Sequence, residues 1–128
     1  MTRRWHGNDG RQAEAIARLW LRLKGWRIQD CRARTPHGEL DIIARRGKLL
    51  AFIEVKQRRH LEQALLCLQP RQQQRIVRAA MHWLSQHPHA SRLHIRFDLI
   101  ALNHLFLLRH LPDAFRPEEV LRMATSPV

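Results

Sequence analysis

The chain has 128 residues, in which 23 lysines and arginines outnumber 11 aspartates and glutamates, so the formal net charge is +12 with nine neutral histidines. This length and the 45% hydrophobic content predict a single globular domain over residues 1–128 and exclude global disorder. The positive excess raises the electrostatic potential over the whole surface and favours a polyanionic partner such as nucleic acid.

Other classes of protein are excluded by what the sequence lacks. Apolar runs such as 64–68 and 105–108 are far shorter than the roughly 20 residues of a membrane-spanning helix, and no apolar segment follows the basic N-terminus. Cys31 and Cys67 form no Cys-x-x-Cys motif, so neither a disulfide framework nor a cysteine zinc site is indicated. We therefore expect a cytoplasmic protein without a membrane partner.

The first predicted element is a helix over residues 11–24. Asn8 and Asp9 are good helix N-caps, apolar residues then recur at helical spacing, and Gly25 ends the run. Residues 1–8 before it are expected to form a loose basic arm.

A β-hairpin is predicted at the centre of the chain. Residues 39–44 and 49–57 are strand-like and flank the basic turn 45–48, and a strand over 26–33 precedes them. The hairpin therefore forms the second and third strands of the predicted fold.

A second helix is predicted over residues 71–86, which a proline opens and another proline follows. Residues 93–102 alternate between apolar and polar side chains, as a strand does, and 105–111 form a last strand. The order is α-β-β-β-α-β with an extra C-terminal strand. We expect an ordered core over about 9–111 and a loose tail over 122–128.

The few acidic residues occur where charge is unusual. Glu39, Asp41 and Glu54 lie within the two most apolar strand-like runs, and Lys56 follows two residues after the last of them. Because side chains alternate along a strand, Glu39 and Asp41 share one face of the first strand. Glu54 and Lys56 likewise share one face of the second.

The hairpin turn determines which of these residues oppose one another. The expected cross-strand pairs are Ala44 with Leu49, Asp41 with Phe52 and Glu39 with Glu54. Both charged sets then point the same way, with directly opposed Cβ atoms about 5 Å apart and diagonal ones about 7 to 8 Å. Carboxylates so placed repel one another unless a cation lies between them. Lys56 supplies one positive charge, and a divalent cation supplies two.

Asp41 and Glu54, diagonal across this hairpin, suit Mg²⁺, which takes oxygen ligands from one or two carboxylates, waters and substrate phosphates. A bound cation polarises a phosphodiester, while Lys56 stabilises the developing charge or orients the nucleophile. Alternatively, Glu54 and Lys56 are ordinary cross-strand partners on a solvated face. Leu50 and Phe52 share that face, which favours the metal site.

Four motifs together resemble a known family. They are Gly38-Glu-Leu-Asp-Ile-Ile43, Phe52-Ile-Glu-Val-Lys-Gln-Arg58, Gly10-Arg-Gln-Ala-Glu14 and Arg96-Phe-Asp98. In these motifs the chain resembles the YraN family of small bacterial proteins, over about residues 7–102. That family looks like a minimal member of the PD-(D/E)xK endonuclease-like superfamily, which includes restriction enzymes and archaeal Holliday-junction resolvases.

The resemblance implies an α/β fold with a mixed β-sheet flanked by helices, the restriction-endonuclease-like arrangement. It implies that Asp41 and Glu54 bind Mg²⁺ or Mn²⁺ with help from the backbone carbonyl of Val55, and that Lys56 is catalytic. Glu14, on the first helix, matches the acid that reaches toward the same metal in resolvase-like members.

Two positions depart from the pattern of that superfamily. Leu40 stands where the superfamily's name places a proline, although the YraN-like Gly-Glu-x-Asp motif has the same departure. Gln72 stands where the family usually has a lysine at the start of the second helix. A phosphate contact or an active-site charge is therefore missing, or Arg71 or Arg75 replaces it.

Basic and polar residues on both sides of the proposed site are candidates for binding nucleic acid. They are Arg58, Arg59, Arg71, Gln72 and Arg75. A plain solvated face explains the arginines as well. Each true phosphate contact adds nearly one unit to the salt slope of binding, so this slope separates the two readings.

Three of the acids also have structural explanations. Glu14 forms a favourable i, i+4 pair with Arg18, worth only tenths of a kcal/mol. Glu39 is either a ligand or a contact to the turn near Gly38, and we favour the structural role. Asp98 is expected to pair locally with arginine rather than to bind metal. The histidines lack a defined ligand spacing, so a zinc site is not indicated.

The leading hypothesis is a metal-dependent DNA endonuclease or nuclease-like protein that hydrolyses phosphodiester bonds, with structured or branched DNA as a candidate substrate. The runner-up is a nucleic-acid-binding module that keeps the fold without turnover, motivated by Gln72 and by the modest chain length. A third reading is a protein-interaction scaffold. Cleavage of two strands of a junction would favour a two-fold homodimer.

Overall fold

A computed structural model describes residues 7–125 of the chain. In chain order its elements are α1 (Gly7–Leu23), β1 (Arg27–Thr35), β2 (Gly38–Arg46), β3 (Leu49–Gln57), α2 (Leu61–Leu65), α3 (Pro70–Ser85), the 3₁₀ helix η1 (Pro88–Arg92), β4 (His94–Leu102), β5 (Leu108–Phe115) and α4 (Pro117–Thr125). None of the helices in residues 7–125 is both long and apolar enough to cross a membrane.

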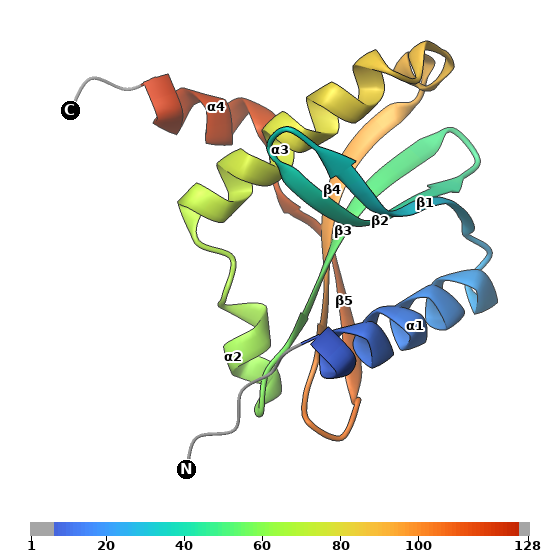
Figure 1. Ribbon diagram of the computed structural model, residues 1–128, viewed down its shortest axis with the longest axis vertical. Coiled ribbons are helices and arrows are strands. Elements are labelled where there is room, and N and C mark those ends of the chain that lie inside the picture. The colour runs from blue at the N-terminus through green and yellow to red at the C-terminus, as the bar shows by residue number, and fades with distance from the viewer. Residues whose placement is uncertain (1–6, 126–128) are drawn as a thin grey trace.

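The strands form one mixed sheet of five in the order β1-β2-β3-β4-β5 (Figure 1). Only β3 and β4 are parallel, and the chain crosses between them through α2, α3 and η1. Every other neighbouring pair is antiparallel. The predicted α/β class with a mixed sheet and flanking helices is confirmed.

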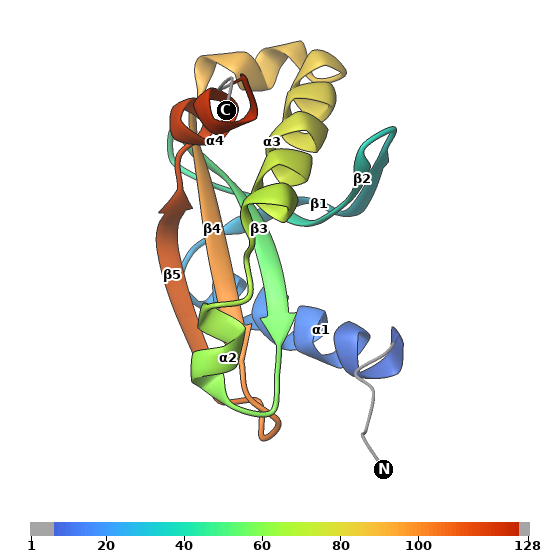
Figure 2. The same ribbon diagram turned by 90° about the vertical axis from the view of Figure 1, so that its left-hand side faces the viewer.

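Alternating side chains of the sheet build two separate hydrophobic cores. Phe52 on β3 packs with Ile76 and Trp83 of α3 on one face. On the other face, Ile53 packs with Ala17 of α1. Figure 2 shows α3 and α4 near one end of the sheet and α1 and α2 near the other. The strand β3 therefore runs between both cores.

The hairpin register differs from the expected one by two residues. Arg46 pairs with Leu49 and Ile43 with Phe52, so Gly47 and Lys48 form a two-residue turn. Gly47 has φ of +62°, which the first position of such a hairpin turn favours. The predicted pairs Ala44–Leu49, Asp41–Phe52 and Glu39–Glu54 are therefore wrong. A shift of two residues leaves the side chains of the paired segment on their predicted faces, with Ile43 on one face and Ile42 and Ala44 on the other.

The two ends of the chain contain more structure than the sequence predicts. α1 begins at Gly7, so Asn8 and Asp9 lie within the helix instead of capping it, and residues 1–6 of the predicted arm lie outside the described residues. At the other end, α4 continues to Thr125, so the predicted loose tail is wrong for 122–125. Residues 126–128 lie outside the described residues.

Helix α4 forms because its buried face completes a core. Val120 is only 1% exposed and belongs to the α3-side core. Pro117 in the first turn and the acidic Glu118 and Glu119 after it are typical of a helix start. The last strand also lies later than predicted, because the Asn103 side chain accepts hydrogen bonds from two backbone amides of the turn before β5.

Candidate metal and nucleic-acid site

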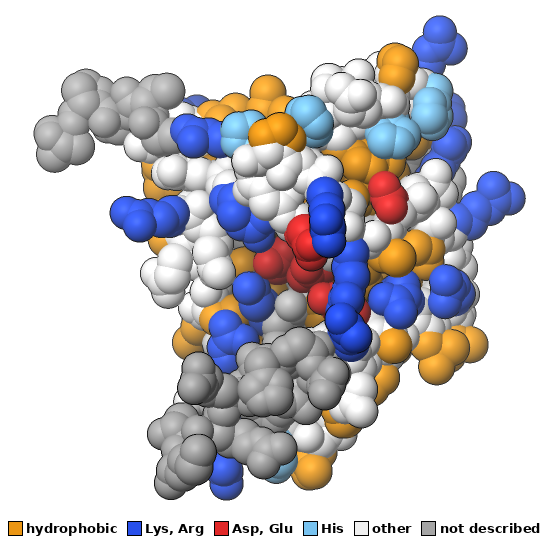
Figure 3. Space-filling model, in the orientation of Figure 1, with side chains coloured by type: hydrophobic (Ala, Val, Ile, Leu, Met, Phe, Trp, Pro, Cys, Tyr) orange, Lys and Arg blue, Asp and Glu red, His pale blue; other side chains and the backbone are white. Residues whose placement is uncertain are grey.

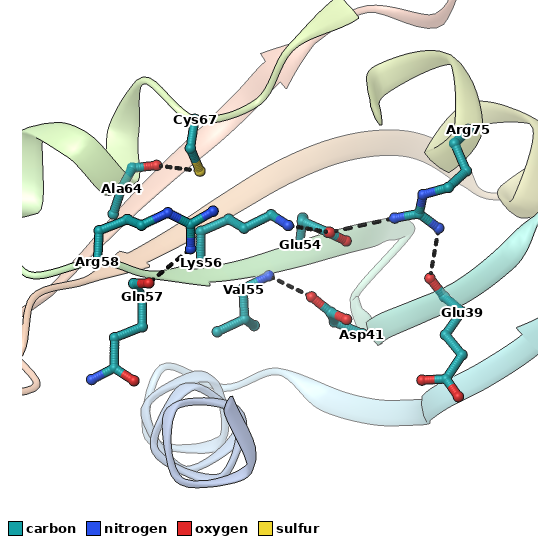
Figure 4. Close-up of polar contacts among 10 residues, drawn as sticks. All are labelled: Glu39, Asp41, Glu54, Val55, Lys56, Gln57, Arg58, Ala64, Cys67 and Arg75. Atoms are coloured by element: carbon teal, nitrogen blue, oxygen red, sulfur yellow. Dashed lines mark hydrogen bonds and ion pairs between the residues drawn. The ribbon is translucent and has the colours of Figure 1, made fainter. Parts of the chain in front are cut away.

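The candidate site begins where β2 separates from β3. The β2–β3 ladder ends at Ile42–Ile53, one residue before Asp41 and Glu54 would face each other. From there the Asp41 carboxylate takes over as a partner, and its Oδ2 accepts a hydrogen bond of 2.8 Å from the Val55 amide (Figure 4). The separation of the two strands thus places a carboxylate beside Glu54 within the sheet.

Glu54 is held between two cations. It is 4% exposed, and its Oε2 lies 3.4 Å from Lys56 Nζ and 3.5 Å from Arg75 Nη2. Lys56 comes from the same strand, whereas Arg75 extends from α3 (Figure 4). A buried carboxylate needs such partners, because removing a charge from water is costly.

The charge of Asp41 is disfavoured by its surroundings. Burial raises its pKa well above the ordinary aspartate range, and the negative charges of Glu54 and Glu14 raise it further. The hydrogen bond from the Val55 amide and the charge of Lys56 act in the opposite direction without cancelling this effect. Extra positive charge next to Asp41 would therefore stabilise the ionised form.

Glu14 reaches this region from α1 but is engaged elsewhere. Its Oε1 accepts a hydrogen bond of 2.8 Å from Nε of Arg32 on β1, and its side chain is 15% exposed. No ion pair with Arg18 occurs within the described residues, so the predicted i, i+4 pair is replaced by a contact between α1 and β1. Glu14 acts on Asp41 through its charge, and its role as a metal ligand stays a prediction.

The acids lie together within a basic surface. In Figure 3, a small group of acidic side chains occupies the middle of one face and is flanked by lysines and arginines. This arrangement places negative charge where a surface of net positive potential would hold a polyanion.

The donor set fits a cation that takes few protein ligands. Asp41 Oδ1 and Glu54 Oε1 accept no hydrogen bond from the described residues, so each carboxylate has one oxygen available. Within the same residues, no three His, Cys, Asp or Glu side chains group closely enough to hold a metal ion. Two carboxylates suit Mg²⁺ or Mn²⁺, which keep water and substrate oxygens, better than a closed protein cage.

A glycine makes room for Arg75. Arg75 Nη1 donates to the Glu39 backbone carbonyl at 3.0 Å, next to Gly38 at the start of β2. Gly38 has φ of +111°, and a Cβ atom placed there would lie 2.7 Å from Arg75 Nη1. The position of the Arg75 guanidinium beside Glu39 and Glu54 thus depends on the missing side chain of Gly38.

We predict that Gly38→Ala costs about 1 to 3 kcal/mol of unfolding free energy, because it combines a strained backbone with displacement of Arg75. Urea unfolding followed by circular dichroism measures this change. The matched control is Gly10→Ala within α1, where a Cβ meets nothing within 4 Å and a gain of about 0.5 to 1 kcal/mol is expected. Equal stability of Gly38→Ala and wild type would contradict the role of Gly38.

The five residues predicted to bind nucleic acid differ in their contacts and exposure. Arg58 donates to the Gln57 carbonyl at 2.8 Å, and the Arg59 side chain is exposed. Arg71 is exposed in the first turn of α3, with the half-buried Gln72 beside it. Arg75 instead pairs with Glu54, so it supplies a positive charge to the site from the same helix in which Gln72 lacks one.

Of two further acids, Asp98 has the contact expected for it, whereas Glu39 pairs with an arginine instead of the turn backbone near Gly38. Glu39 is half exposed and pairs with Arg34 at 3.6 Å, away from Glu54. Asp98 is completely buried, and both its oxygens accept hydrogen bonds of 2.8 Å from Arg96. The expected local pairing of Asp98 with arginine is confirmed.

Some contacts of the site have no signal in the sequence. Arg32 lies 18 residues after the Glu14 that it contacts, and Arg75 lies 21 residues after Glu54. No periodic pattern spans such distances, since both contacts depend on how a helix packs on the sheet. These two contacts could therefore not be predicted without the tertiary structure.

The element order and the site define a class of protein. A mixed sheet in α-β-β-β-α-β order, with Asp41 on β2 and Glu54 and Lys56 on β3, is consistent with a restriction-endonuclease-like core. The profile of the uncharacterised protein family UPF0102 matches residues 13–102. The chain belongs to this YraN-like family, as its motifs predict.

Relatives from several bacteria share most of the chain. A UPF0102 protein of Rhodopseudomonas palustris strain BisB18 is 50% identical over 106 residues, which are 83% of this chain and 78% of the relative. One from Parvibaculum lavamentivorans is 47% identical over 108 residues, or 84% of this chain and 81% of the relative. A third, from Caulobacter vibrioides, is 49% identical over 83% of this chain and 85% of its own.

Proposed function

We propose that the protein is a Mg²⁺- or Mn²⁺-dependent DNA endonuclease that hydrolyses phosphodiester bonds in structured or branched DNA. The observation that carries this proposal is the pair formed by the half-buried Asp41 and the buried Glu54, each with one oxygen available, beside the lysine of a Glu-x-Lys motif. The unfavourable charge of Asp41 supports it, because a divalent cation relieves the repulsion between the two carboxylates.

Each residue of the site has a distinct task in this reaction. Asp41 and Glu54 would hold the metal, with the Val55 carbonyl as a third ligand and Glu14 assisting through its charge. When bound, the metal would supply the Lewis acid that polarises a phosphodiester and makes a water molecule more acidic. Lys56, whose Nζ lies 3.4 Å from Glu54 Oε2, would donate to a phosphate oxygen of the substrate and stabilise the charge that develops there. Arg75 holds Glu54 in place from α3.

Lys56→Ala is expected to lower metal-dependent cleavage by about 10²- to 10³-fold, since removal of one group that stabilises transition-state charge typically has this effect. Labelled linear, single-stranded and four-way-junction DNAs incubated with Mn²⁺ provide the assay. Lys48→Ala, at the exposed hairpin turn, is the matched control and should cleave as wild type does. Cleavage unaffected by Lys56→Ala would remove Lys56 from the reaction.

The second candidate function is a nucleic-acid-binding module without turnover. Its specific support is that Lys56 and Arg75 already bracket Glu54, so one carboxylate of the pair has cationic partners without a metal. Calorimetric titration of wild type with Mn²⁺ separates the two candidates. Binding of one ion per chain supports the nuclease, whereas tight DNA binding with no Mn²⁺ uptake and no cleavage supports the module.

A further inference from the structure

A basic pocket lies between α1 and β1, on the side of the acids away from α3. It has a volume of about 320 Å³ and is lined by Arg11, Arg18, Cys31 and Arg32. No carboxylate among residues 7–125 lines it. Three guanidinium groups around one small pocket repel one another, and an anion between them would relieve this repulsion.

Two of these guanidinium groups are uncompensated. Arg11 and Arg18 lie seven residues apart on one face of α1, about 10 Å along the helix axis. Neither forms an ion pair or a side-chain hydrogen bond within the described residues. Arg32 alone has an acidic partner, because Glu14 pairs with it at 2.8 Å. The pocket therefore retains an excess of positive charge.

Arg32 is held in a costly backbone conformation. Its φ is +52°, a left-handed value that costs a residue other than glycine about 1 to 3 kcal/mol. In this conformation its side chain both lines the pocket and donates to Glu14. Such a conformation persists only where the surrounding contacts hold it, and the ion pair with Glu14 is one such contact.

The same arginine connects the pocket to the acids. The hydrogen bond and charge of Glu14 raise the pKa of Arg32, and the charges of Glu39 and Asp41 raise it further. Cys31 pairs with Ile42 and Ala33 with Leu40, so Arg32, which lines the pocket, lies next to Asp41 across the β1–β2 ladder. A phosphate bound in the pocket would therefore lie next to the candidate metal site.

We propose that Arg11, Arg18 and Arg32 form a phosphate-binding pocket that holds the backbone of the nucleic acid on the α1 side of the acids. This inference rests on the proposed function for its substrate class and assigns a new surface to it. The predicted contacts at Arg58, Arg59 and Arg71 follow β3 or lie on α3, so the pocket would bind the same backbone from another element.

The spacing of the pocket favours a polymer over a free phosphate. Arg11 and Arg18 extend from backbone positions about 10 Å apart along α1, so their side chains can contact successive phosphates of one strand. A nucleic-acid backbone presents successive phosphates and engages both guanidiniums at once. Inorganic phosphate shares the chemistry of the ligand but brings only one phosphate group to the pocket.

The test measures binding without cleavage. Labelled duplex and four-way-junction DNA are titrated with full-length protein by fluorescence anisotropy in chelator, between about 50 and 200 mM salt. The variant Arg11→Ala/Arg18→Ala should lower the magnitude of the salt slope by about two units, close to one per lost phosphate contact. Arg32 is left in place because Glu14 depends on it. Thermal melting checks that the variant is folded.

The control removes the same charge from elsewhere. Arg92→Ala/Arg109→Ala replaces two exposed arginines of η1 and β5 outside the pocket, and its slope should stay near that of wild type. Equal slope losses in both double variants, or no DNA binding by wild type, would overturn the pocket. So would displacement of DNA by millimolar inorganic phosphate at constant ionic strength in wild type alone. Absence of cleavage with Mn²⁺ would instead reject the nuclease function. It would not affect the conclusion about the pocket, because binding is measured without metal.

Discussion

Asp41→Asn is expected to lower metal-dependent cleavage by about a thousandfold or more, since loss of about 4 kcal/mol of transition-state stabilisation gives this factor. The asparagine keeps the shape of the side chain, and its carbonyl oxygen can still accept the hydrogen bond from Val55. The variant therefore removes the charge and leaves the β2–β3 junction intact. Cleavage of junction and linear DNA with Mn²⁺ measures the effect.

The same substitution should stabilise the protein in the absence of metal. Because burial and Glu54 raise the folded-state pKa of Asp41, the folded protein holds this proton to higher pH than the unfolded chain does. Wild-type stability then falls as the pH rises from the ordinary aspartate range through the raised pKa, and Asp41→Asn lacks this loss. Mn²⁺ should raise the Tm of wild type and leave the variant unchanged.

Asp113→Asn is the matched control for this experiment. Asp113 lies on the half-exposed end of β5 and pairs with Arg116 at 3.3 Å, away from the acids of the site. Its amide variant should cleave as wild type does and should melt at nearly the same temperature. Full cleavage by Asp41→Asn would reject the site, whatever the control shows.

Asp98→Asn is expected to destabilise the fold by about 3 to 5 kcal/mol, the usual result of removing one partner from a buried ion pair. Asp98 is fully buried and accepts two hydrogen bonds of 2.8 Å from Arg96. His110 Nε2 lies 2.8 Å from Oδ2, and the Asp113 amide donates to Oδ1 at 2.9 Å. The carboxylate thus joins β4 to β5, and urea unfolding measures its contribution.

The pH dependence of this contribution has the opposite sign to that of Asp41. Burial alone would raise the pKa of Asp98, but the hydrogen bonds from His110, Arg96 and the Asp113 amide outweigh burial and lower it. The stabilisation is therefore present above the ordinary aspartate range and is lost as the pH falls through the lowered pKa. Asp98→Asn should lack this acid-induced loss.

The exposed Asp113 again supplies the comparison for Asp98. Asp113→Asn changes the same chemical group in the same strand pair and should stay within about 0.5 kcal/mol of wild type. A loss below about 1 kcal/mol for Asp98→Asn, or an unchanged acid limb, would show that the buried network contributes little to stability.

The hairpin shows how far local patterns lead. Alternation of apolar and charged residues places Asp41 and Glu54 on one face, and the structure keeps them there despite the two-residue change of register. The pattern cannot determine that register, because it depends on which residues enter the turn. Gly47 and Lys48 form that turn. If the observed register is continued, Asp41 lies directly opposite Glu54 and not diagonal to it as predicted.

The ends of the chain show a second limit of local reasoning. The alternation over 93–102 correctly predicts β4, whereas Asn103 delays β5 through hydrogen bonds that no hydrophobic pattern reveals. Helix α4 has a recognisable start at Pro117, but its stability comes from burying Val120 against a core made by α3 and the sheet. A short helix of this kind is marginal without such packing.

The sequence by itself determined the α/β class, the family and the charged face that Asp41, Glu54 and Lys56 share. These follow from periodicity and motifs, which are local properties of the chain. Only the tertiary structure decided which cations meet which acids, with Arg75 at Glu54 and Arg32 at Glu14. The physical reason is that these pairs join a helix to a strand, and their geometry is fixed by how α1 and α3 pack on the two faces of the sheet.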